Sequence, residues 1–349
     1  GVPLILETPD MHTQANTPRS SFTEVLDHIL KDLDEAAIVL PVSYPANEAG
    51  RATKGAALAL KARILLQNYR YEEVISTIET LKGLDQYSLY PNYQGIFKKE
   101  NEGNAEVIFD IRFKGPEFTN EYDIIMAQYN TQAPLQGLVD AYRMKDGKTT
   151  AESNLYNPTQ PYENRDPRFK QTILYLGAPW RNRTATVVDL HQTGYTFRKF
   201  TKYDETTAIT IPPAESDVSY IEIRYADVLL MYAEAINELR GSTSDVYAAV
   251  NAVRQRPTVN MPPLPEGLDK EAMKQAIRLE RRIELAGEGS YFYDIRRWKT
   301  IEQEMNAPIR DHAGNVIVTR RFNPGRDYSW PVPYTEIDLN PALTQNPNY

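Results

Sequence analysis

Three glutamates recur at helical spacing in the most charged stretch of the sequence, LERRIELAGEGSYFYDIRRWKT at residues 279–300. Because Glu280, Glu284 and Glu288 stand four residues apart, a helix would place their carboxylates on one face. Paired carboxylates are the acid and base of glycoside hydrolysis, and they can also hold a metal ion. The same stretch carries four arginines: Arg281, Arg282, Arg296 and Arg297. The alternative interpretation is therefore a partly buried network of ion pairs.

We favour the structural interpretation, because carboxylates at helical spacing among so many arginines most often stabilise a fold. A glycoside hydrolase that uses Glu280 and Glu284 is the disfavoured alternative. Trp298, near the end of the stretch, is expected to pack between helices with its indole N–H hydrogen-bonded. We therefore predict that this stretch holds the fold together.

The sequence contains no motif for other catalytic, metal-binding or cofactor-binding chemistry. The four histidines, at positions 12, 28, 191 and 312, lack the spacing of metal ligands, and cysteine is absent. No Gly-x-Ser-x-Gly motif or phosphate-binding loop occurs, and the segment Gly287-Glu288-Gly289 lacks the third glycine of a dinucleotide motif. We expect no catalytic residue, no metal and no cofactor.

Composition narrows the class of protein further. The chain has 349 residues, of which 41% are hydrophobic, so it can bury a sizeable core. A net charge of -8 argues against a nucleic-acid-binding protein, which needs a basic surface to neutralise phosphates. No run of about 18 apolar residues occurs, so no segment is expected to span a membrane as a helix. The 23 tyrosines and 24 prolines are typical of a loop-rich binding surface.

Helical signals fall in two blocks, residues 20–83 and 223–300, which we predict to form a helical scaffold. In the first block Ser21 and Glu24 form a capping box ahead of an apolar repeat. Further helices are expected from near Thr53, over 71–81, from Tyr225 to Gly241, over 246–253 and from near Asp269. Each block contains a helix, a short turn and a second helix with alanine near the crossing point. This is a loose tetratricopeptide-like repeat.

Residues 84–222, between the two blocks, have the pattern of a long, irregular, loop-rich insert. Short β-like runs such as EVIFDIRF at 106–113 stand among proline, glycine, asparagine and aspartate. Residues 301–349 have the pattern of an extended, proline-punctuated tail. We predict one mainly α-helical domain over residues 1–349, in which the insert contributes a few short strands and is built out from the helices.

Five segments spaced through the chain share a pattern with one known family. They are RATKGAALALKARILL (51–66), YIEIRYADVLLMYAEAINE (220–238), AVNAVRQR (249–256), LERRIELAGEG…DIRRW (279–298) and EIDLNPALTQNPNY (336–349). In this order they resemble the SusD/RagB family of outer-membrane nutrient-binding lipoproteins. The resemblance implies a SusD-like α-superhelix of tetratricopeptide-like hairpins, with an irregular region that carries the ligand site. It also implies a protein that is not an enzyme.

The resemblance further implies a surface-exposed lipoprotein of the Gram-negative outer membrane that captures oligosaccharide or polysaccharide. Such a protein delivers its ligand to a SusC-like TonB-dependent transporter, as in starch-utilisation-type systems. The alternatives are a peptide-binding member of the same family and a generic tetratricopeptide adaptor, which the aromatic-rich insert disfavours. The family carries its lipidated cysteine in an N-terminal part ahead of the segment that matches Gly1. The present chain is therefore expected to be the C-terminal two thirds of such a protein.

Aromatic side chains of the insert are the expected sugar contacts, because a ring stacks on the apolar face of a sugar while polar groups bind its hydroxyls. Trp180 stands in the loop-like segment LGAPWRN, so we expect it at the surface, with Arg181 and Asn182 as donors beside its ring. The resemblance adds weight, since family ligand contacts often fall on aromatics around this stretch. The other candidates are Tyr156, Tyr162 and Tyr129, and for the last two we favour packing in the core or at the rim over a ligand contact.

Overall fold

The structure is a computed structural model that describes residues 1–8, 16–125, 132–208, 210–212 and 214–349. In this part of the chain most regular structure is helical, and the strands are short and paired two by two. The predicted class, mainly α-helical with a loop-rich insert that contains a few short strands, is confirmed.

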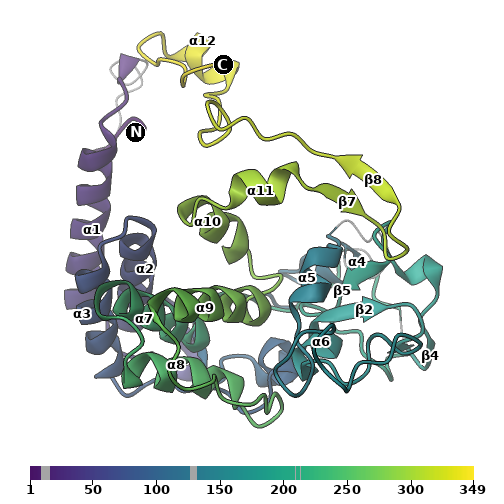
Figure 1. Ribbon diagram of the computed structural model, residues 1–349. Coiled ribbons are helices and arrows are strands. Elements are labelled where there is room, and N and C mark those ends of the chain that lie inside the picture. Colours follow the sequence, from purple (N-terminus) through teal and green to yellow (C-terminus); the bar gives the residue numbers. More distant parts are fainter. Residues whose placement is uncertain (9–15, 126–131, 209, 213) are drawn as a thin grey trace.

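The helical scaffold occupies the left and centre of Figure 1. Its helices are α1 (Phe22–Val39), α2 (Lys54–Gln67), α3 (Tyr71–Lys82), α7 (Tyr225–Arg240), α8 (Ser244–Arg254), α9 (Lys270–Glu284) and α10 (Ser290–Arg297). Helix α2 packs against α3, α7 packs against α8, and both α3 and α9 pack against α7. Fully buried alanines on α2 and α7, among them Ala59, Ala62 and Ala233, let these helices approach closely.

The ends of the scaffold helices follow from local sequence signals. The Ser21 hydroxyl accepts a hydrogen bond from the Glu24 backbone N–H at 3.2 Å, and the Glu24 carboxylate accepts one from the Ser21 N–H at 2.8 Å. This reciprocal pair is the predicted capping box of α1. Thr53 and Asp269 cap α2 and α9 with their side-chain oxygens. Gly241, with a φ of 77°, ends α7, because glycine adopts this left-handed region without steric cost.

The insert lies mainly on the right of Figure 1. It contains the helices α4 (Tyr122–Ile124), α5 (Gln136–Ala141) and α6 (Pro167–Thr172) and the strands β1 (Val107–Ile111), β2 (Ile173–Tyr175), β3 (Pro179–Trp180), β4 (Arg183–Thr184) and β5 (Tyr195–Phe197). Strand β2 pairs with β5 and β3 pairs with β4, all antiparallel. Strand β1 pairs with β6 (Tyr220–Arg224), which leads directly into α7, so this sheet ties the insert to the scaffold.

The C-terminal tail is not extended throughout, so that part of the prediction is wrong. Residues 301–349 form α11 (Ile301–Asn306), the paired strands β7 (Pro308–Arg310) and β8 (Val316–Thr319), and α12 (Tyr334–Leu339). Pro333 stands directly ahead of α12, where a proline needs no backbone N–H and does not prevent a helix. The Asn340 side-chain amide donates to the carbonyl oxygen of Thr17 at 2.8 Å. The tail thus returns to the start of α1, and the two termini lie close together in Figure 1.

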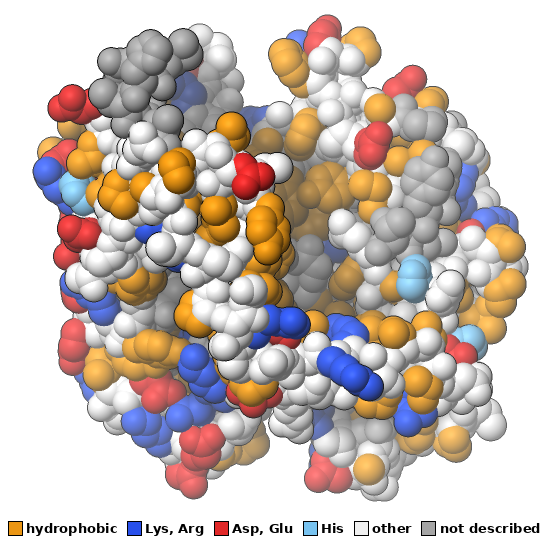
Figure 2. Space-filling view, turned by 90° about the horizontal axis from the view of Figure 1, so that it is seen from above, with side chains coloured by type: hydrophobic (Ala, Val, Ile, Leu, Met, Phe, Trp, Pro, Cys, Tyr) orange, Lys and Arg blue, Asp and Glu red, His pale blue; other side chains and the backbone are white. Residues whose placement is uncertain are grey.

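The molecule is hollowed between its two sides when it is seen from above, and hydrophobic side chains gather on the walls of this hollow (Figure 2). Large apolar side chains that stay more than half exposed include Phe22 and Ile38 of α1, Tyr293 of α10, and Trp330 and Tyr334 of the tail. None of the helices in the described ranges is long and apolar enough to cross a membrane.

Candidate ligand-binding site

The charged stretch at 279–300 forms a buried ion-pair network, as the structural interpretation predicted. The carboxylate of Glu284, on α9, is fully buried. It accepts hydrogen bonds from three guanidinium groups, those of Arg168 at 2.8 Å, Arg224 at 2.7 Å and Arg256 at 2.9 Å. Burial raises the pKa of Glu284, but the three guanidinium groups outweigh it and hold this pKa well below its usual range. An enclosed, ionised carboxylate of this kind cannot serve as a general acid toward a sugar.

The ion-pair partners that the described residues supply to these glutamates come from outside the stretch, so the expected pairing with Arg281, Arg282, Arg296 and Arg297 was wrong. The partners are Arg168 and Arg254 for Glu280, and Arg224 and Lys199 for Glu288. Of the arginines within the stretch, Arg281 and Arg297 are buried and pair with Asp294, whereas Arg282 and Arg296 lie over the rings of Tyr291 and Phe292. Because Arg168 and Lys199 belong to the insert, the network joins the insert to the scaffold.

Trp298 lies where the sequence predicted it. Its indole N–H donates to the carboxylate of Glu234 on α7 at 2.9 Å. The guanidinium groups of Arg278 and Arg297 lie 4.9 Å and 5.0 Å from its ring. The ring is therefore held by the network, and its role in the described structure is to link α10 to α7.

Lys199 connects the insert to the C-terminal end of α9 through three contacts. Its ammonium group donates to the carbonyl oxygens of Glu284 and Ala286, both at 3.0 Å, and forms an ion pair with Glu288. Burial lowers the pKa of Lys199 to about 8, although the Glu288 carboxylate acts in the opposite direction. The insert is thus fixed to the scaffold by a cation that titrates just above neutral pH.

A depression of about 490 Å³ opens in the surface of the insert, and we call it the Tyr162 depression. An aromatic and aliphatic wall is formed by Tyr162, Tyr175, Leu176, Pro161 and Pro179. The polar lining includes Gln160, Glu163, Lys170, Arg198 and Glu205. Ring surface next to donors and acceptors is the combination that a polyhydroxylated ligand requires.

The aromatic wall is held rigidly by neighbouring rings. The ring centroid of the half-buried Tyr162 lies 4.2 Å from that of Tyr175 and 5.6 Å from that of Phe169, with which it is stacked. Its hydroxyl lies 3.2 Å from the hydroxyl of Tyr195. These contacts fix the position of the Tyr162 ring while part of it faces the depression. A ring held in this way loses little conformational freedom when a ligand binds.

Arg198 provides the polar floor of the Tyr162 depression. Its side chain is 3% exposed, its Nη2 donates to the Glu205 carboxylate at 2.7 Å, and its guanidinium lies 5.1 Å from the centroid of the Trp180 ring. The Nε–H of Arg198 has no hydrogen-bond partner among the residues that the structure describes. A buried donor without a partner costs about 1–3 kcal/mol.

A charged pair stands at the rim of the depression. The Lys170 ammonium donates to the Glu163 carboxylate at 2.6 Å, and both side chains remain about half exposed. Burial lowers the pKa of Lys170, but the interactions of its ammonium group with Glu163 and Tyr175 together outweigh this effect, so the pKa is raised. Arg198 and Glu205 also form an ion pair, so the positive and negative side chains of the depression balance. This balance favours an uncharged ligand.

Trp180 is buried, so the expectation that it lies at the surface is wrong. Its side chain is 2% exposed and meets the ring of Tyr203 edge to face, with centroids 6.1 Å apart. Arg181 and Asn182 have φ values of 53° and 57° and form the two-residue turn between β3 and β4. Their backbone N–H groups donate to the carbonyl oxygens of residues 204 and 205, at 2.8 Å and 2.6 Å. The hairpin therefore folds onto this segment and turns the indole inward.

The other predicted contacts are dispersed. The Arg181 guanidinium lies 4.4 Å from the ring centroid of Tyr203 and donates to Thr210 at 3.0 Å. Asn182 is exposed at the tip of the hairpin, and Tyr156 is half-buried outside the lining of the depression. Tyr129 lies outside the described residues. Of the predicted candidates with described positions, Tyr162 alone lines the depression.

The sequence-based prediction missed Arg198, Glu205 and Tyr175. The sequence holds one usable signal, the run YTFRK at 195–199, in which a charged residue follows directly on an apolar strand pattern. In the described ranges no group of three or more histidine, aspartate or glutamate side chains is arranged to hold a metal ion.

Two family models match the sequence of this chain. Residues 73–349 match the family model described as the SusD family, and residues 1–66 match one described as starch-binding associating with outer membrane. The chain therefore belongs to the SusD family, as the resemblance of its five segments indicated.

Individual relatives match nearly the whole chain. The SusD-like proteins P38 and P25 of Formosa agariphila are 28% and 27% identical over 100% and 99% of this chain, which spans 70% and 66% of their lengths. A solved SusD-like protein of Bacteroides fragilis is 33% identical to this chain, with a TM-score of 0.86. The match covers 100% of this chain and 75% of the solved chain. A second solved structure from that species is described as a SusD-like carbohydrate-binding protein and is 27% identical, with a TM-score of 0.87. The match covers 98% of this chain and 75% of that solved chain.

Proposed function

We propose that this protein is a non-catalytic glycan-binding subunit of the Gram-negative outer-membrane surface. It captures oligosaccharide or polysaccharide and delivers it to a SusC-like TonB-dependent transporter. The observation that carries the proposal is the Tyr162 depression, in which an aromatic wall lies beside the polar side chains of Glu163, Lys170 and Glu205. Membership of the SusD family and the description of the second Bacteroides fragilis structure support a carbohydrate ligand. The description of the family that matches residues 1–66 supports the location at the outer membrane.

The chemistry of the Tyr162 depression suits a sugar. The C–H face of a pyranose packs against Tyr162 and the adjoining Leu176, which is 44% exposed. Hydroxyl groups then donate to the carboxylates of Glu163 and Glu205. Binding alone requires no general base, and the carboxylates of the buried network do not reach the depression.

Calorimetric titration of the chain with maltohexaose, laminarihexaose and cellohexaose tests this function. Saturable heat is expected for at least one glucan. It should weaken roughly five- to tenfold in Tyr162→Leu, which keeps an apolar group in the wall but removes the ring. Tyr334→Leu, on an exposed tyrosine of the tail, is the matched control and should bind as the unaltered chain does.

Four further outcomes decide the remaining parts of the proposal. Unchanged affinity in Tyr162→Leu, with the fold intact by circular dichroism, would remove the site from the Tyr162 depression. Release of shorter sugars during long incubations would overturn the non-catalytic role. Delivery is tested by retention of the chain, with glucan bound, on an immobilised SusC-like transporter. Saturable binding of tyrosine-rich peptides together with failure of every glycan would favour the peptide alternative.

A further inference from the structure

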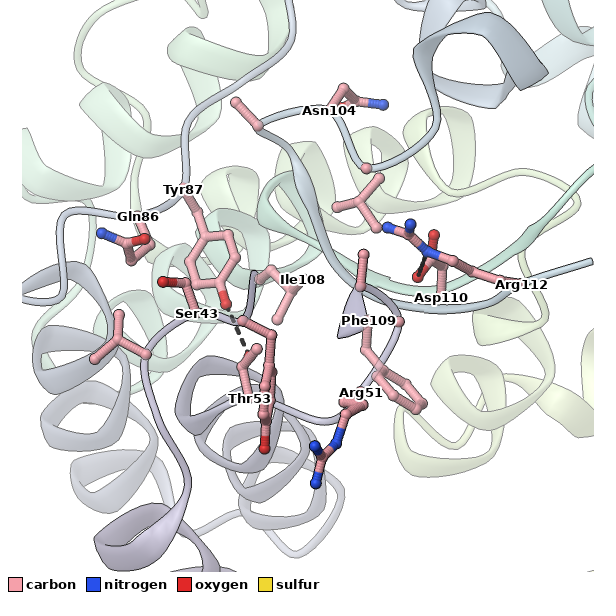
Figure 3. A pocket seen from close by; sticks show the side chains of 17 residues that line it. Ser43, Arg51, Thr53, Gln86, Tyr87, Asn104, Ile108, Phe109, Asp110 and Arg112 are labelled. Atoms are coloured by element: carbon pink, nitrogen blue, oxygen red, sulfur yellow. Dashed lines mark hydrogen bonds and ion pairs between the residues drawn. The ribbon is translucent and has the colours of Figure 1, made fainter. Parts of the chain in front are cut away.

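A second pocket, of about 230 Å³, lies on the scaffold side of the protein between the segment ahead of α2 and strand β1 (Figure 3). Four consecutive residues of the strand, Val107 to Asp110, contribute to its lining. Because successive side chains of a strand point to opposite faces, a cavity that touches four in a row lies along the edge of the strand. Strand β1 has a single strand neighbour, β6, in the described part of the chain. We call this cavity the β1 pocket.

Aromatic rings stand on the walls of the β1 pocket. In Figure 3 the ring of Tyr87 stands on one side and that of Phe109 on the other, with Ile108 between them. The lining also includes Tyr44, and the Arg51 guanidinium lies 4.6 Å from its ring centroid. Rings on more than one wall can hold a flat or chair-shaped six-membered ring between them.

Two glycines allow side chains that line the β1 pocket to pack closely against the backbone. A Cβ atom at Gly55 would overlap the Tyr87 ring, so the glycine allows this ring to cross the first turn of α2. There the Tyr87 hydroxyl lies 3.1 Å from Thr53 Oγ1, the side chain that caps α2. Gly103, with a φ of 71°, lies so close to Arg112 that a Cβ atom would come within 2.8 Å of its Nη2. The pocket is thus formed before any ligand arrives, which reduces the entropic cost of binding.

The charged groups of the β1 pocket are already matched. The Arg112 guanidinium donates to the Asp110 carboxylate at 3.2 Å, and Arg51 pairs with Glu48. Uncharged donors and acceptors line the rest, from Ser43, Gln86 and Asn104. An anionic ligand would have to displace Asp110 or Glu48 from its arginine, whereas an uncharged polyol keeps both pairs.

We infer that the β1 pocket is a second saccharide site, which takes one neutral pyranose ring. Its volume lies below the roughly 300–1,000 Å³ typical of sites for larger ligands, so a single ring fits and an oligosaccharide does not. The inference rests on the proposed function only for its choice of a sugar as ligand. The β1 pocket and the Tyr162 depression share no lining residue, so the two sites can be tested separately.

Saturation-transfer NMR with D-glucose, D-galactose, D-mannose and D-glucuronate tests this inference on the intact chain. Transfer to at least one neutral hexose is expected, and it should persist in Tyr162→Leu. It should fall at least about fivefold, equal to about 1 kcal/mol, in Tyr44→Ala, which removes a wall, and in Ser43→Trp, which fills the pocket from an exposed position. Ser76→Trp, an exposed serine on α3, is the control for the second variant and should leave the transfer unchanged.

Each other outcome overturns the inference. Transfer that survives Ser43→Trp would place the hexose elsewhere, and transfer lost in Tyr162→Leu would assign it to the Tyr162 depression. Absence of transfer to all three hexoses, or stronger transfer to D-glucuronate than to D-glucose, would exclude a neutral ring. Hexasaccharide binding that depends on Tyr162, together with absence of transfer to every hexose tested, would leave the proposed function intact and remove this second site.

Discussion

Arg168 and Glu284 meet at 2.8 Å although 116 positions separate them in the sequence, and both side chains are completely buried. Arg168 is held from its other side by Asp166, which caps α6 and binds the same guanidinium at 2.7 Å. Glu284 is the last residue of α9. The pair therefore fixes the segment that carries the Tyr162 depression to the last turn of a scaffold helix.

Replacement of Glu284 should reveal how much the fold depends on this network. We expect Glu284→Gln to lower the free energy of unfolding by about 3–5 kcal/mol, because it leaves buried guanidinium groups without their counter-charge. Urea denaturation measures the change. Glu72→Gln, at a carboxylate whose side chain is 68% exposed, should change stability by less than about 0.5 kcal/mol. A loss below about 1 kcal/mol at Glu284 would contradict the role that we assign to the network.

Trp180 should behave as a core residue in mutagenesis. We expect Trp180→Ala to lower the free energy of unfolding by about 3–5 kcal/mol, because it empties a space under the Arg198 floor. The matched control is Trp330→Ala, at an indole that is 72% exposed, with an expected change within about 0.5 kcal/mol. If thermal and chemical unfolding of Trp180→Ala match those of the unaltered chain, the indole is not packed in the core.

Lys199 should give the protein a pH-dependent component of stability. Its pKa of about 8 in the folded state lies below the ordinary value of 10.5, so between these values the unfolded chain binds a proton that the folded chain has released. The free energy of unfolding therefore rises with pH in this window, by at most about 1.4 kcal/mol per pH unit. Burial raises the pKa of Tyr93 and Tyr142, which opposes the rise above about pH 10.

The contribution of Lys199 is isolated by measuring the free energy of unfolding of the unaltered chain and of Lys199→Met from pH 8 to pH 10. The difference between the two is informative because all other titrating groups are the same in both chains. We expect this difference to grow with pH in favour of the unaltered chain. Lys31→Met, at an exposed lysine, should preserve the rise. Parallel stability curves for the unaltered chain and Lys199→Met would show that Lys199 keeps its proton throughout.

Loss of the hydrogen bonds between the tail and the segment ahead of α1 should destabilise the protein only locally. Asn340→Ala and Arg19→Ala each remove a hydrogen bond between the two ends, to Thr17 and Thr344 respectively. Such bonds contribute about 0.5–1.5 kcal/mol net. Hydrogen exchange should therefore accelerate in residues 334–345 while global unfolding hardly changes. Asn315→Ala, in the exposed β7–β8 turn, is the control and should not alter exchange in that segment. Faster exchange across α2 and α7 would mean that the tail supports the whole scaffold.

The sequence predicted the scaffold well because its signals are local. The capping box at Ser21, the caps at Thr53 and Asp269 and the glycine at position 241 each act over a few residues, and the structure places helix ends there. The same reasoning failed for the tail, which was predicted to be extended and proline-punctuated, although Pro333 stands just ahead of α12.

The candidate site was only partly predictable. Tyr162 was among the expected contacts, but Trp180 was assigned to the surface because its sequence neighbours are polar and loop-like. Those neighbours form a two-residue turn whose backbone bonds to residues 204 and 205, and this long-range contact turns the indole inward. Arg198 was missed for the same reason, since only the folded chain brings its guanidinium between Trp180 and Glu205.

By itself, the sequence determined the helical scaffold, the family and the absence of a readable catalytic motif, because each depends on residue types at short spacing. The tertiary structure alone decided which arginines neutralise Glu284, which aromatic rings reach the surface and where cavities open. These features depend on contacts between segments that are far apart in the chain, as with Arg168 and Glu284. A pattern confined to neighbouring residues carries no information about such contacts, because burial is a property of the packed molecule.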